Sequence, residues 1–342
     1  MKHTESRRGR AGRVGRVVQM AVALGLAVLF LLTGCSSIRP IAASKQDLRV
    51  VATCDGYDVC YDELRYITMA YRDEYRARYG ERVFEDAGYV EKFRQDVEYA
   101  LTANYAILSM CRELNLDLED DAVTQAVQEK IEDAVDQLGG FRAYKDFLKQ
   151  TYLTDHFLRF TLRTDQGETE IIHALMDVGV ILKDEKDFIA YALDGNFCAT
   201  YHVFIGNDEG DNIEENRANA ALVRDKLLGG ETIQKMMGSK YNEDTSLVST
   251  PYYFTYGEYD EAYEQAAFGL EIGGISEVVE TEDGFYVIVR QPLDEQYLVR
   301  NVTSLMQRYQ YAEVERMLTD LRKDMTIEWN EYGASLDLLT ME

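Results

Sequence analysis

The four histidines of the chain, His3, His156, His173 and His202, are its first candidates for proton chemistry or metal binding. Their spacing does not form the His-Glu-x-x-His pattern of zinc hydrolases, and the chain has neither a Gly-x-Ser-x-Gly elbow nor a glycine-rich phosphate loop. The absence of these patterns argues against a hydrolase, a zinc site or a nucleotide-binding function. His202 lies in Thr200–Ile205, whose alternating β-branched and aromatic residues predict a strand. By position alone, a histidine on such a strand is usually a hydrogen-bonded structural residue.

Cysteine is the next reactive residue type, and Cys35 stands in a distinctive setting. Six basic residues precede an apolar run from Val17 to Leu32, which is typical of a signal peptide. The run ends in Leu32-Thr33-Gly34-Cys35-Ser36, which resembles the lipobox of bacterial lipoproteins, where the cysteine is diacylated and becomes the new N-terminus. The alternative is an ordinary cleaved signal peptide with a coincidental cysteine. We expect a signal peptide over residues 1–34 and a lipid anchor on Cys35.

The remaining cysteines are Cys54, Cys60, Cys111 and Cys198. Outside the cytoplasm, pairs of them could oxidise. A two-residue turn at Asp55-Gly56 would place Cys54 opposite Tyr57. It would leave Cys60 opposite Val51, which disfavours a disulfide between Cys54 and Cys60. The spacings fit no zinc pattern, and the sequence leaves the disulfide state open.

Acidic residues dominate the chain, with 61 against 36 basic ones and a net charge of −25. Without residues 1–34, 60 acidic and 30 basic side chains remain, a net charge of −30. Such a surface does not bind nucleic acid electrostatically and is repelled by anionic lipid, so we expect attachment to the membrane through lipid on Cys35. The acidity could attract cationic unfolded chains, or it could be a solvated surface without a preferred partner.

Hydrophobic periodicity predicts a helical first half and a mixed second half. Residues 36–47 are small and polar and predict a tether, and Val50–Tyr61 predicts two short strands around a turn. A helical pattern continues from Asp62 to about Ala192. The elements expected after it are strand Thr200–Ile205, helices Ile213–Leu228 and Thr232–Gly238, strand Pro251–Tyr256, helix Tyr259–Leu270, strands Val278–Thr281 and Phe285–Arg290, a long helix from Asp294 to about Lys323 and strand Thr326–Trp329.

The stretch Ala199–Gln291 begins with the strand of His202 and has Leu228-Gly229-Gly230 at the end of its first helix. Its most specific part is the run Gln265-Ala266-Ala267-Phe268-Gly269-Leu270-Glu271-Ile272-Gly273-Gly274-Ile275-Ser276-Glu277-Val278-Val279-Glu280-Thr281. This stretch resembles the parvulin domain of peptidyl-prolyl isomerases, almost residue for residue in the long run. The first half, with Val51-Ala52-Thr53 and Gly139-Gly140-Phe141, resembles more weakly the chaperone part of PrsA-like and SurA-like foldases.

The parvulin resemblance implies a set of site residues. Its catalytic positions fall on His202, Asp244, Thr281 and Tyr286, and its substrate-binding positions on Tyr259, Tyr263, Pro251, Phe254 and Phe268. Tyr259 and Tyr263 would receive the proline ring. Two departures from the family stand out: Tyr286 replaces its second histidine, and residues 249–254 replace a glycine-rich strand, which would reshape or close a pocket built on that strand.

The chemistry that the resemblance implies needs no cofactor or metal. Rotating an X-Pro amide crosses a barrier of ~20 kcal/mol without breaking a bond. Catalysis means binding the twisted amide better than either planar isomer. A dry apolar slot weakens amide resonance, and His202 and Asp244 at its mouth would bias the carbonyl group.

The sequence thus predicts an α+β protein. A helical chaperone lobe, formed by the N-terminal segment and a C-terminal helix, contains an inserted parvulin-like domain whose small antiparallel sheet is covered by helices. Expected boundaries are 1–34 for the signal peptide, 35–47 for the tether, 48–194 for the lobe, 195–293 for the parvulin-like domain and 294–342 for the segment that returns to the lobe.

The expected function is that of a foldase anchored to the outer face of the bacterial cytoplasmic membrane, which isomerises X-Pro bonds in unfolded or newly translocated polypeptides. One alternative is a weak or inactive parvulin-like domain that serves as a non-enzymatic chaperone or scaffold. Another is a lipoprotein adaptor that binds a single partner.

Overall fold

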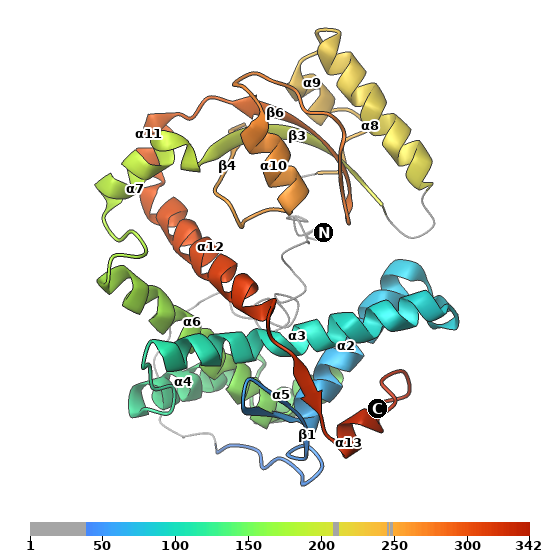
Figure 1. The fold of residues 1–342 in the computed structure, drawn as a ribbon, viewed down its shortest axis with the longest axis vertical. Coiled ribbons are helices and arrows are strands. Elements are labelled where there is room, and N and C mark those ends of the chain that lie inside the picture. Colours follow the sequence, from blue (N-terminus) through green and yellow to red (C-terminus); the bar gives the residue numbers. More distant parts are fainter. Residues whose placement is uncertain (1–38, 208–211, 245, 247–248) are drawn as a thin grey trace. The chain divides into compact units, whose positions relative to one another are not determined.

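The computed structural model describes residues 39–207, 212–244, 246 and 249–342 (Figure 1). The expected signal peptide and Cys35 lie outside these residues. Within the described ranges, no helix has both the length and the apolar character that crossing a membrane requires. The described chain forms two compact units: a helical unit, residues 39–174 with Met317–Glu342, and a sheet unit, Leu175–Arg316.

The helical unit consists of long helices and a three-stranded sheet of order β2-β1-β7. The C-terminal strand β7 pairs antiparallel with β1, so the last residues of the chain complete a sheet that the first strand begins. The elements of this unit are β1 Val50–Cys54, β2 Tyr57–Cys60, α2 Tyr61–Tyr79, the 3-10 turn η1 Val83–Glu85, α3 Ala87–Glu113, α4 Asp121–Gln137, α5 Phe141–Gln150, most of α6 Asp155–Asp177, the end of α12 Val302–Arg322, β7 Ile327–Trp329 and α13 Glu331–Ala334.

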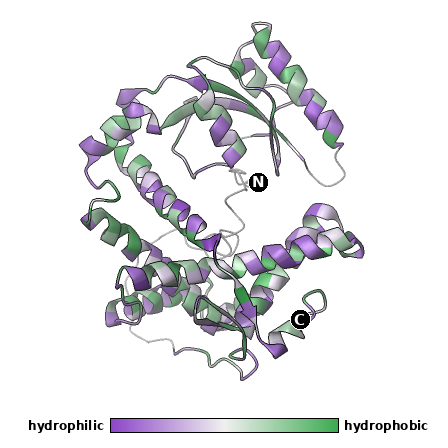
Figure 2. Cartoon of the chain, viewed as in Figure 1, coloured by the Kyte–Doolittle hydropathy of each residue, from purple (hydrophilic) through white to green (hydrophobic). Residues whose placement is uncertain are grey.

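The helices of this unit form where apolar residues recur every three or four positions and a capping residue comes first. On α3, Phe93, Val97 and Leu101 are fully buried, and the side chain of Asp86 accepts hydrogen bonds from the first backbone amides. Figure 2 shows the resulting mixture of hydrophilic and hydrophobic residues along each helix. Gly139 and Gly140, both with positive φ, follow the end of α4 as the sequence predicts.

The β1–β2 hairpin corrects one detail of the prediction. Cys54 pairs with Tyr57 as expected, but Cys60 pairs with Val50 and not with Val51, because the register shifts between Val50 and Ala52. All four described cysteines are free thiols. Burial raises the pKa of the Cys54 and Cys60 thiols to about 11 and keeps them protonated near neutral pH.

The sheet unit is an antiparallel sheet of order β4-β3-β6-β5, with α8 and α9 packed on one face and α10 on the other. This arrangement confirms the predicted α+β fold with a small, helix-covered antiparallel sheet. Its elements are α7 Glu185–Tyr191, the π-helical turn η2 Ala192–Asn196, β3 Cys198–Gly206, α8 Ile213–Leu228, α9 Ile233–Met237, β4 Tyr252–Phe254, α10 Glu261–Gly269, β5 Val279–Thr281, β6 Gly284–Gln291, α11 Glu295–Arg300 and the first part of α12.

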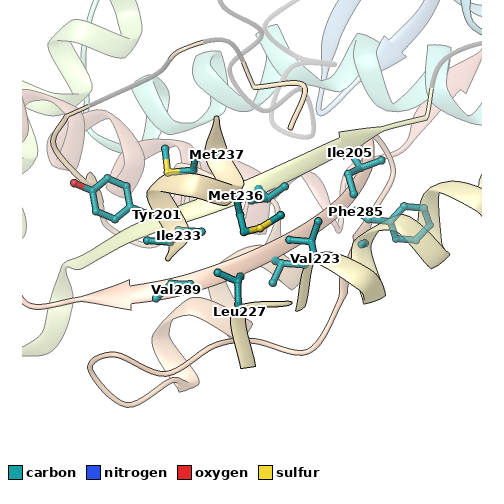
Figure 3. Packing of buried hydrophobic residues seen from close by; sticks show 12 residues of the cluster. Tyr201, Ile205, Val223, Leu227, Ile233, Met236, Met237, Phe285 and Val289 are labelled. Carbon is teal, nitrogen blue, oxygen red and sulfur yellow. The ribbon is translucent and has the colours of Figure 1, made fainter. Parts of the chain in front are cut away.

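The hydrophobic core of the sheet unit lies between one face of β3 and β6 and the helices α8 and α9 (Figure 3). Odd-numbered residues of the two strands build it: Tyr201, Val203, Ile205, Phe285, Val287 and Val289. Gly284 begins β6 with a φ of 148°, and a Cβ atom there would lie 2.2 Å from the carbonyl oxygen of Ile205. Only glycine therefore permits the close approach of β3 and β6 at this end of the sheet.

The long helix expected from Asp294 to Lys323 is two helices, and the break lies at Asn301. The side-chain amide of Asn301 donates a hydrogen bond of 2.8 Å to the carbonyl oxygen of Tyr297, which also accepts the backbone amide of Asn301 at 3.0 Å. Asn301 has a φ of −114°, and its carbonyl oxygen accepts the amide of Leu305 as α12 begins. The apolar periodicity continues through the break, so the sequence pattern did not reveal it.

Glu63, at the start of α2, is a buried carboxyl group with 2% of its surface exposed. The hydroxyl of Tyr105 lies 2.5 Å from Glu63 Oε2 and 3.1 Å from the carbonyl oxygen of Asp58. Tyr105 has one hydroxyl proton for these two acceptors, so both contacts become hydrogen bonds when Glu63 carries a proton. Burial raises the pKa of Glu63 to about 7, although hydrogen bonds from Tyr105 and Asn104 oppose the shift.

This raised pKa predicts that the protein loses stability as the pH rises. Between the ordinary pKa of 4.5 and about 7, the folded state holds a proton that the unfolded chain has released, so the free energy of unfolding should fall by about 3 kcal/mol in total. Glu63→Gln should remove this fall, as urea denaturation at several pH values would measure. The exposed Glu113→Gln is the control, and an unchanged pH slope in Glu63→Gln would contradict the assignment.

Candidate functional site

The face of the sheet opposite the core holds the candidate site, because side chains alternate along β3. Thr200, His202 and Phe204 point to this face, whereas their odd-numbered neighbours enter the core. Strand β6 pairs with β3 in antiparallel register and places Tyr286 beside Phe204. The predicted strand thus delivers His202 to the face covered by α10.

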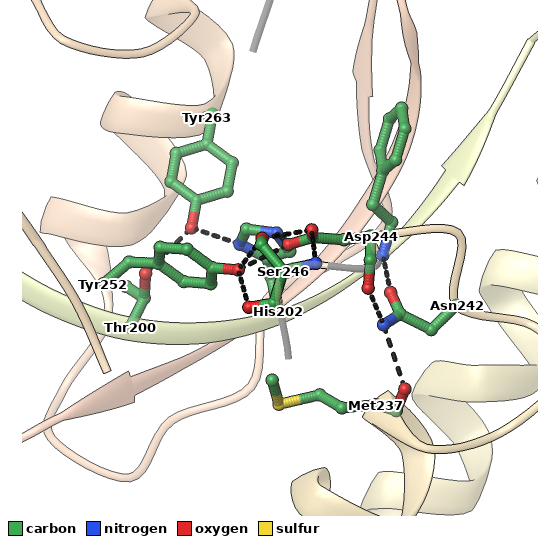
Figure 4. A network of polar contacts seen from close by, with 9 residues as sticks. Thr200, His202, Met237, Asn242, Asp244, Ser246, Tyr252 and Tyr263 are labelled. Carbon is green, nitrogen blue, oxygen red and sulfur yellow. Dashed lines mark hydrogen bonds and ion pairs between the residues drawn. The ribbon is translucent and has the colours of Figure 1, made fainter. Parts of the chain in front are cut away.

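His202 is the centre of a polar network and is only 4% exposed (Figure 4). Its Nε2 atom lies 3.1 Å from Oδ2 of Asp244, and its Nδ1 atom lies 2.9 Å from the hydroxyl of Tyr263. The Tyr263 hydroxyl also lies 2.8 Å from Oγ1 of Thr200. The structure therefore brings together three of the residues that the parvulin resemblance selects, one each from β3, α10 and the loop before β4.

Asp244 is held as an anion by several donors. It accepts the hydroxyl of Tyr252 at 2.5 Å, the backbone amide of Ser246 at 2.9 Å and the Ser246 hydroxyl. Burial alone would raise its pKa, but hydrogen bonds from His202, Ser246 and Tyr252 outweigh burial and hold the pKa of Asp244 well below its usual range. Asn242 fixes this loop, since its Oδ1 accepts the amide of Phe204 at 3.0 Å.

These contacts determine which nitrogen of His202 carries the proton. An ionised Asp244 only accepts hydrogen bonds, so His202 Nε2 must donate to it. In a neutral imidazole, Nδ1 is then an acceptor and receives the hydroxyl proton of Tyr263. Asp244 thus acts on His202 by orienting it and fixing its tautomer.

Tyr252 is the residue of this site that sequence reasoning missed. Its ring stacks on the imidazole of His202, with ring centroids 4.7 Å apart and planes 9° from parallel, while its hydroxyl binds Asp244. It belongs to the segment that departs from the family's glycine-rich strand. The departure was visible in the sequence, but the aromatic and alternating residues of β4 gave no sign that one ring would cover the histidine.

The substrate-binding positions implied by the resemblance form one aromatic cluster between β4 and α10. Tyr263 and Phe254 are fully buried, whereas Tyr259 and Phe268 are half-buried at its edge. The ring of Tyr259 stacks on Tyr263 at 4.8 Å, and Phe268 meets Phe254 edge to face at 5.7 Å. Pro251, directly before β4, is half-buried.

A buried carboxylate positions Tyr259 in this cluster. Glu264, 6% exposed, accepts the backbone amides of Gly257, Glu258 and Tyr259 at 2.8–3.0 Å. Three successive amides on one side chain fix the loop between β4 and α10. Sequence reasoning missed Glu264 as well, because a glutamate in the first turn of a helix is usually a solvated residue.

Tyr286 and Thr281 lie at the site in different ways. The Tyr286 ring meets His202 edge to face at 5.2 Å and packs on Phe204 at 4.6 Å, but within the described residues its hydroxyl makes no hydrogen bond to the network. Thr281 is the last residue of β5, and its hydroxyl donates to the carbonyl oxygen of Gly284 across the turn to β6; among the described residues it makes no hydrogen bond to the polar network. Neither residue contributes an acid or a base to the polar network.

Comparison with known families finds two matching domains in the chain. Residues 10–170 match the SurA-like N-terminal domain, and residues 202–291 match the PPIC-type PPIASE domain. No curated protein sequence matches the chain significantly.

Among solved structures, NmPin, the parvuline of Nitrosopumilus maritimus, is 25% identical, with 28% of this chain and 97% of that one covered and a TM-score of 0.23. The peptidylprolyl isomerase PrsA from Bacillus anthracis is 17% identical, with coverage of 66% and 94% and a TM-score of 0.35. A SurA-like chaperone from Campylobacter jejuni is 11% identical, with coverage of 82% and 99% and a TM-score of 0.29.

The tautomer of His202 is testable by ¹⁵N NMR of labelled imidazole. Where the imidazole is in its neutral form, its proton should lie on Nε2, and Asp244→Asn should destroy this preference because an amide can turn its own N–H toward the ring. Ser246→Ala keeps the carboxylate and should keep the tautomer. A proton on Nδ1 in the unmodified protein would contradict the network.

Proposed function

Because residues 10–170 belong to the SurA-like N-terminal domain family and residues 202–291 to the PPIC-type peptidyl-prolyl isomerase family, we propose that this parvulin-type foldase isomerises X-Pro bonds at the aromatic cluster beside His202 and Asp244. The observation that carries the proposal is the direct contact of His202 with both Asp244 and Tyr263. These two contacts hold the carboxylate of Asp244 next to a set of aromatic rings. In this proposal, rotation of the X-Pro amide takes place in that environment.

His202 acts in this proposal as a positioning residue. It is covered by Tyr252 and only 4% exposed, so substrate does not reach it. Its two nitrogens join Asp244 to Tyr263 and thereby fix the loop and α10 relative to β3. The half-buried rings of Tyr252, Tyr259 and Phe268 are the surfaces that meet the substrate.

The proline ring packs on the half-buried edge of the cluster, at Tyr259 and Phe268. These rings exclude water from the amide, which lowers the advantage of the planar, charge-separated resonance form. Asp244 and the hydroxyls of Ser246 and Tyr252 lie nearby and keep a fixed electrostatic field that need not reorganise as the bond turns. No bond is made or broken, so the residues supply binding and electrostatics only.

Two further parts of the proposal concern the organisation of the chain. We propose that the chaperone lobe spans residues 48–194, the isomerase domain residues 195–293, and the segment that returns to the lobe residues 294–342. The lobe binds unfolded, newly translocated polypeptides and presents their proline residues to the site. The pairing of β7 with β1 and the hydrogen bonds of Arg322 to Tyr99 and Thr102 support the return of the C-terminal segment to the lobe.

A proline-peptide isomerisation assay tests the activity. The unmodified protein should accelerate isomerisation, and Tyr259→Ala should lower kcat/KM by about tenfold or more, since it removes a wall of the slot. Tyr311→Ala, an exposed tyrosine of α12 outside the cluster, is the control. Acceleration that survives Tyr259→Ala unchanged would place the substrate elsewhere.

A second candidate, a non-enzymatic chaperone or scaffold, is favoured by one observation: Tyr252 fills the space over His202. Tyr252→Ala separates the two functions. The isomerase proposal expects this variant to lose rate, because the ring lines the slot. The chaperone alternative expects the unmodified, folded protein to suppress client aggregation with no rate above background, and expects Tyr252→Ala to gain rate as the covered site opens.

The protein is proposed to work outside the cytoplasm, attached to the outer face of the membrane by lipid on Cys35. The basic and apolar blocks before Cys35 and the lipobox resemblance support this location.

Lipidation can be measured by incorporation of labelled palmitate in a bacterial host. Cys35→Ala should abolish the label, and the protein should leave the membrane fraction, whereas Ser36→Ala should retain both. Label that persists in Cys35→Ala would refute the anchor without bearing on the isomerase site.

A further inference from the structure

Helix α5 presents a basic face in a protein that is otherwise strongly acidic. Arg142, Lys145 and Lys149 are all exposed, and their spacing by three and four residues puts them on one side of the helix. None of the three forms an ion pair within the described part of the chain. Asp146, the only acidic residue of α5, lies on the same side of the helix, so this face carries three basic groups against one acidic group. Residues 35–342 contain 60 acidic against 30 basic side chains, so a helix face on which basic groups outnumber acidic ones differs from the average surface of the chain.

The same face exposes apolar groups. Phe141 begins α5 with 40% of its surface exposed, and Leu138, just before the helix, is 39% exposed. The ammonium group of Lys145 lies over the Phe141 ring, 5.4 Å from its centroid. Basic side chains mixed with exposed aromatic and aliphatic ones are the combination found on helices that lie at a membrane surface.

Residues 41–43, at the beginning of the described chain, lie directly against this helix. The backbone amide of Ile41 donates to Oδ2 of the buried Asp155 at 3.1 Å, while Oδ1 of Asp155 accepts the hydroxyl of Tyr144, on α5, at 2.7 Å. Ile41 and Ala43 line one hollow together with Lys145 and Lys149. The expected free tether is therefore shorter than residues 36–47, because its second part is fixed to the lobe.

This contact limits how far α5 lies from the anchor. Five residues lie between Cys35 and Ile41, which makes six Cα–Cα steps. A fully extended chain spans at most about 3.5 Å per step, or roughly 20 Å in all. A lipid on Cys35 inserts at the membrane surface, so the Ile41 end of the helical unit stays within that reach of the lipid headgroups.

We propose that the α5 face formed by Phe141, Arg142, Lys145 and Lys149 rests on the anionic headgroups of the membrane that holds Cys35. This inference rests on the proposed lipid anchor. The net charge of −30 does not prevent it, because charges are screened within about 8–10 Å and only groups close to the surface feel the headgroups. The lipid on Cys35 keeps the helical unit close to the membrane. The basic face of α5 then determines which side of the unit contacts the headgroups.

The experiment uses the mature chain, residues 35–342, coupled through Cys35 to a maleimide lipid in vesicles, so that it does not depend on lipidation in the cell. Phe141→Trp places an indole on the α5 face, and Tyr89→Trp places one at the start of α3 as a control. Trp329, the only tryptophan of the chain, gives the same background in both. Brominated phosphatidylglycerol vesicles should quench the indole at position 141 and leave the one at position 89 unquenched.

Charge variants then test the cause. Arg142→Gln/Lys145→Gln/Lys149→Gln should reduce quenching at position 141 about fivefold or more, and so should replacing phosphatidylglycerol by phosphatidylcholine. The matched variant Lys183→Gln/Lys186→Gln/Arg300→Gln changes the net charge equally and should have no effect. The proposal would be overturned if the indole at position 141 is not quenched, or if the triple charge variant is quenched as strongly as the unmodified face. It would also be overturned if an acidic peptide binds α5 in competition with the vesicles.

Discussion

The register of β3 against β6 is the constraint on which the candidate site depends. Because strand side chains alternate, the same nine residues that supply Tyr201, Val203 and Ile205 to the core supply Thr200, His202 and Phe204 to the opposite face. A shift by one residue would bury the imidazole against α8 and α9 and expose the core residues. Gly284 secures the register at one end, since no other residue fits beside the carbonyl oxygen of Ile205. Fold stability and site geometry therefore rest on one set of backbone hydrogen bonds.

The features that could be predicted from the sequence are those that depend on the local periodicity of apolar residues. The α+β class, the helix Ile213–Leu228 and the strand that carries His202 follow from patterns of three, four and two residues. The family resemblance added what periodicity cannot give, namely that Asp244 and Tyr263, far apart in sequence, belong beside His202. Asp244 and Tyr263 contact the two ring nitrogens of His202 only in the folded tertiary structure, so the sequence pattern of one strand cannot predict these contacts.

The unpredicted features share a physical origin in side chains that compete with the backbone or with each other. Asn301 divides an apolar helix because its amide binds a carbonyl group of the preceding turn. Tyr252 covers His202 because a planar ring can stack on an imidazole while its hydroxyl reaches the carboxylate behind it. Glu264 is buried because three loop amides converge on it. Each depends on a partner brought near by folding, and none changes the hydrophobic pattern that a sequence displays.

The pairing of β1 with β7 has a consequence for the order in which the molecule is completed. The chain is synthesised from its N-terminus, and β1 contains residues 50–54 while β7 contains residues 327–329, so one edge of β1 stays unpaired until almost all of the polypeptide has been made. The strands of the sheet unit lie within a much shorter stretch and close earlier. The sheet unit can therefore be complete while the helical unit still lacks β7, which leaves one edge of β1 open to an added strand.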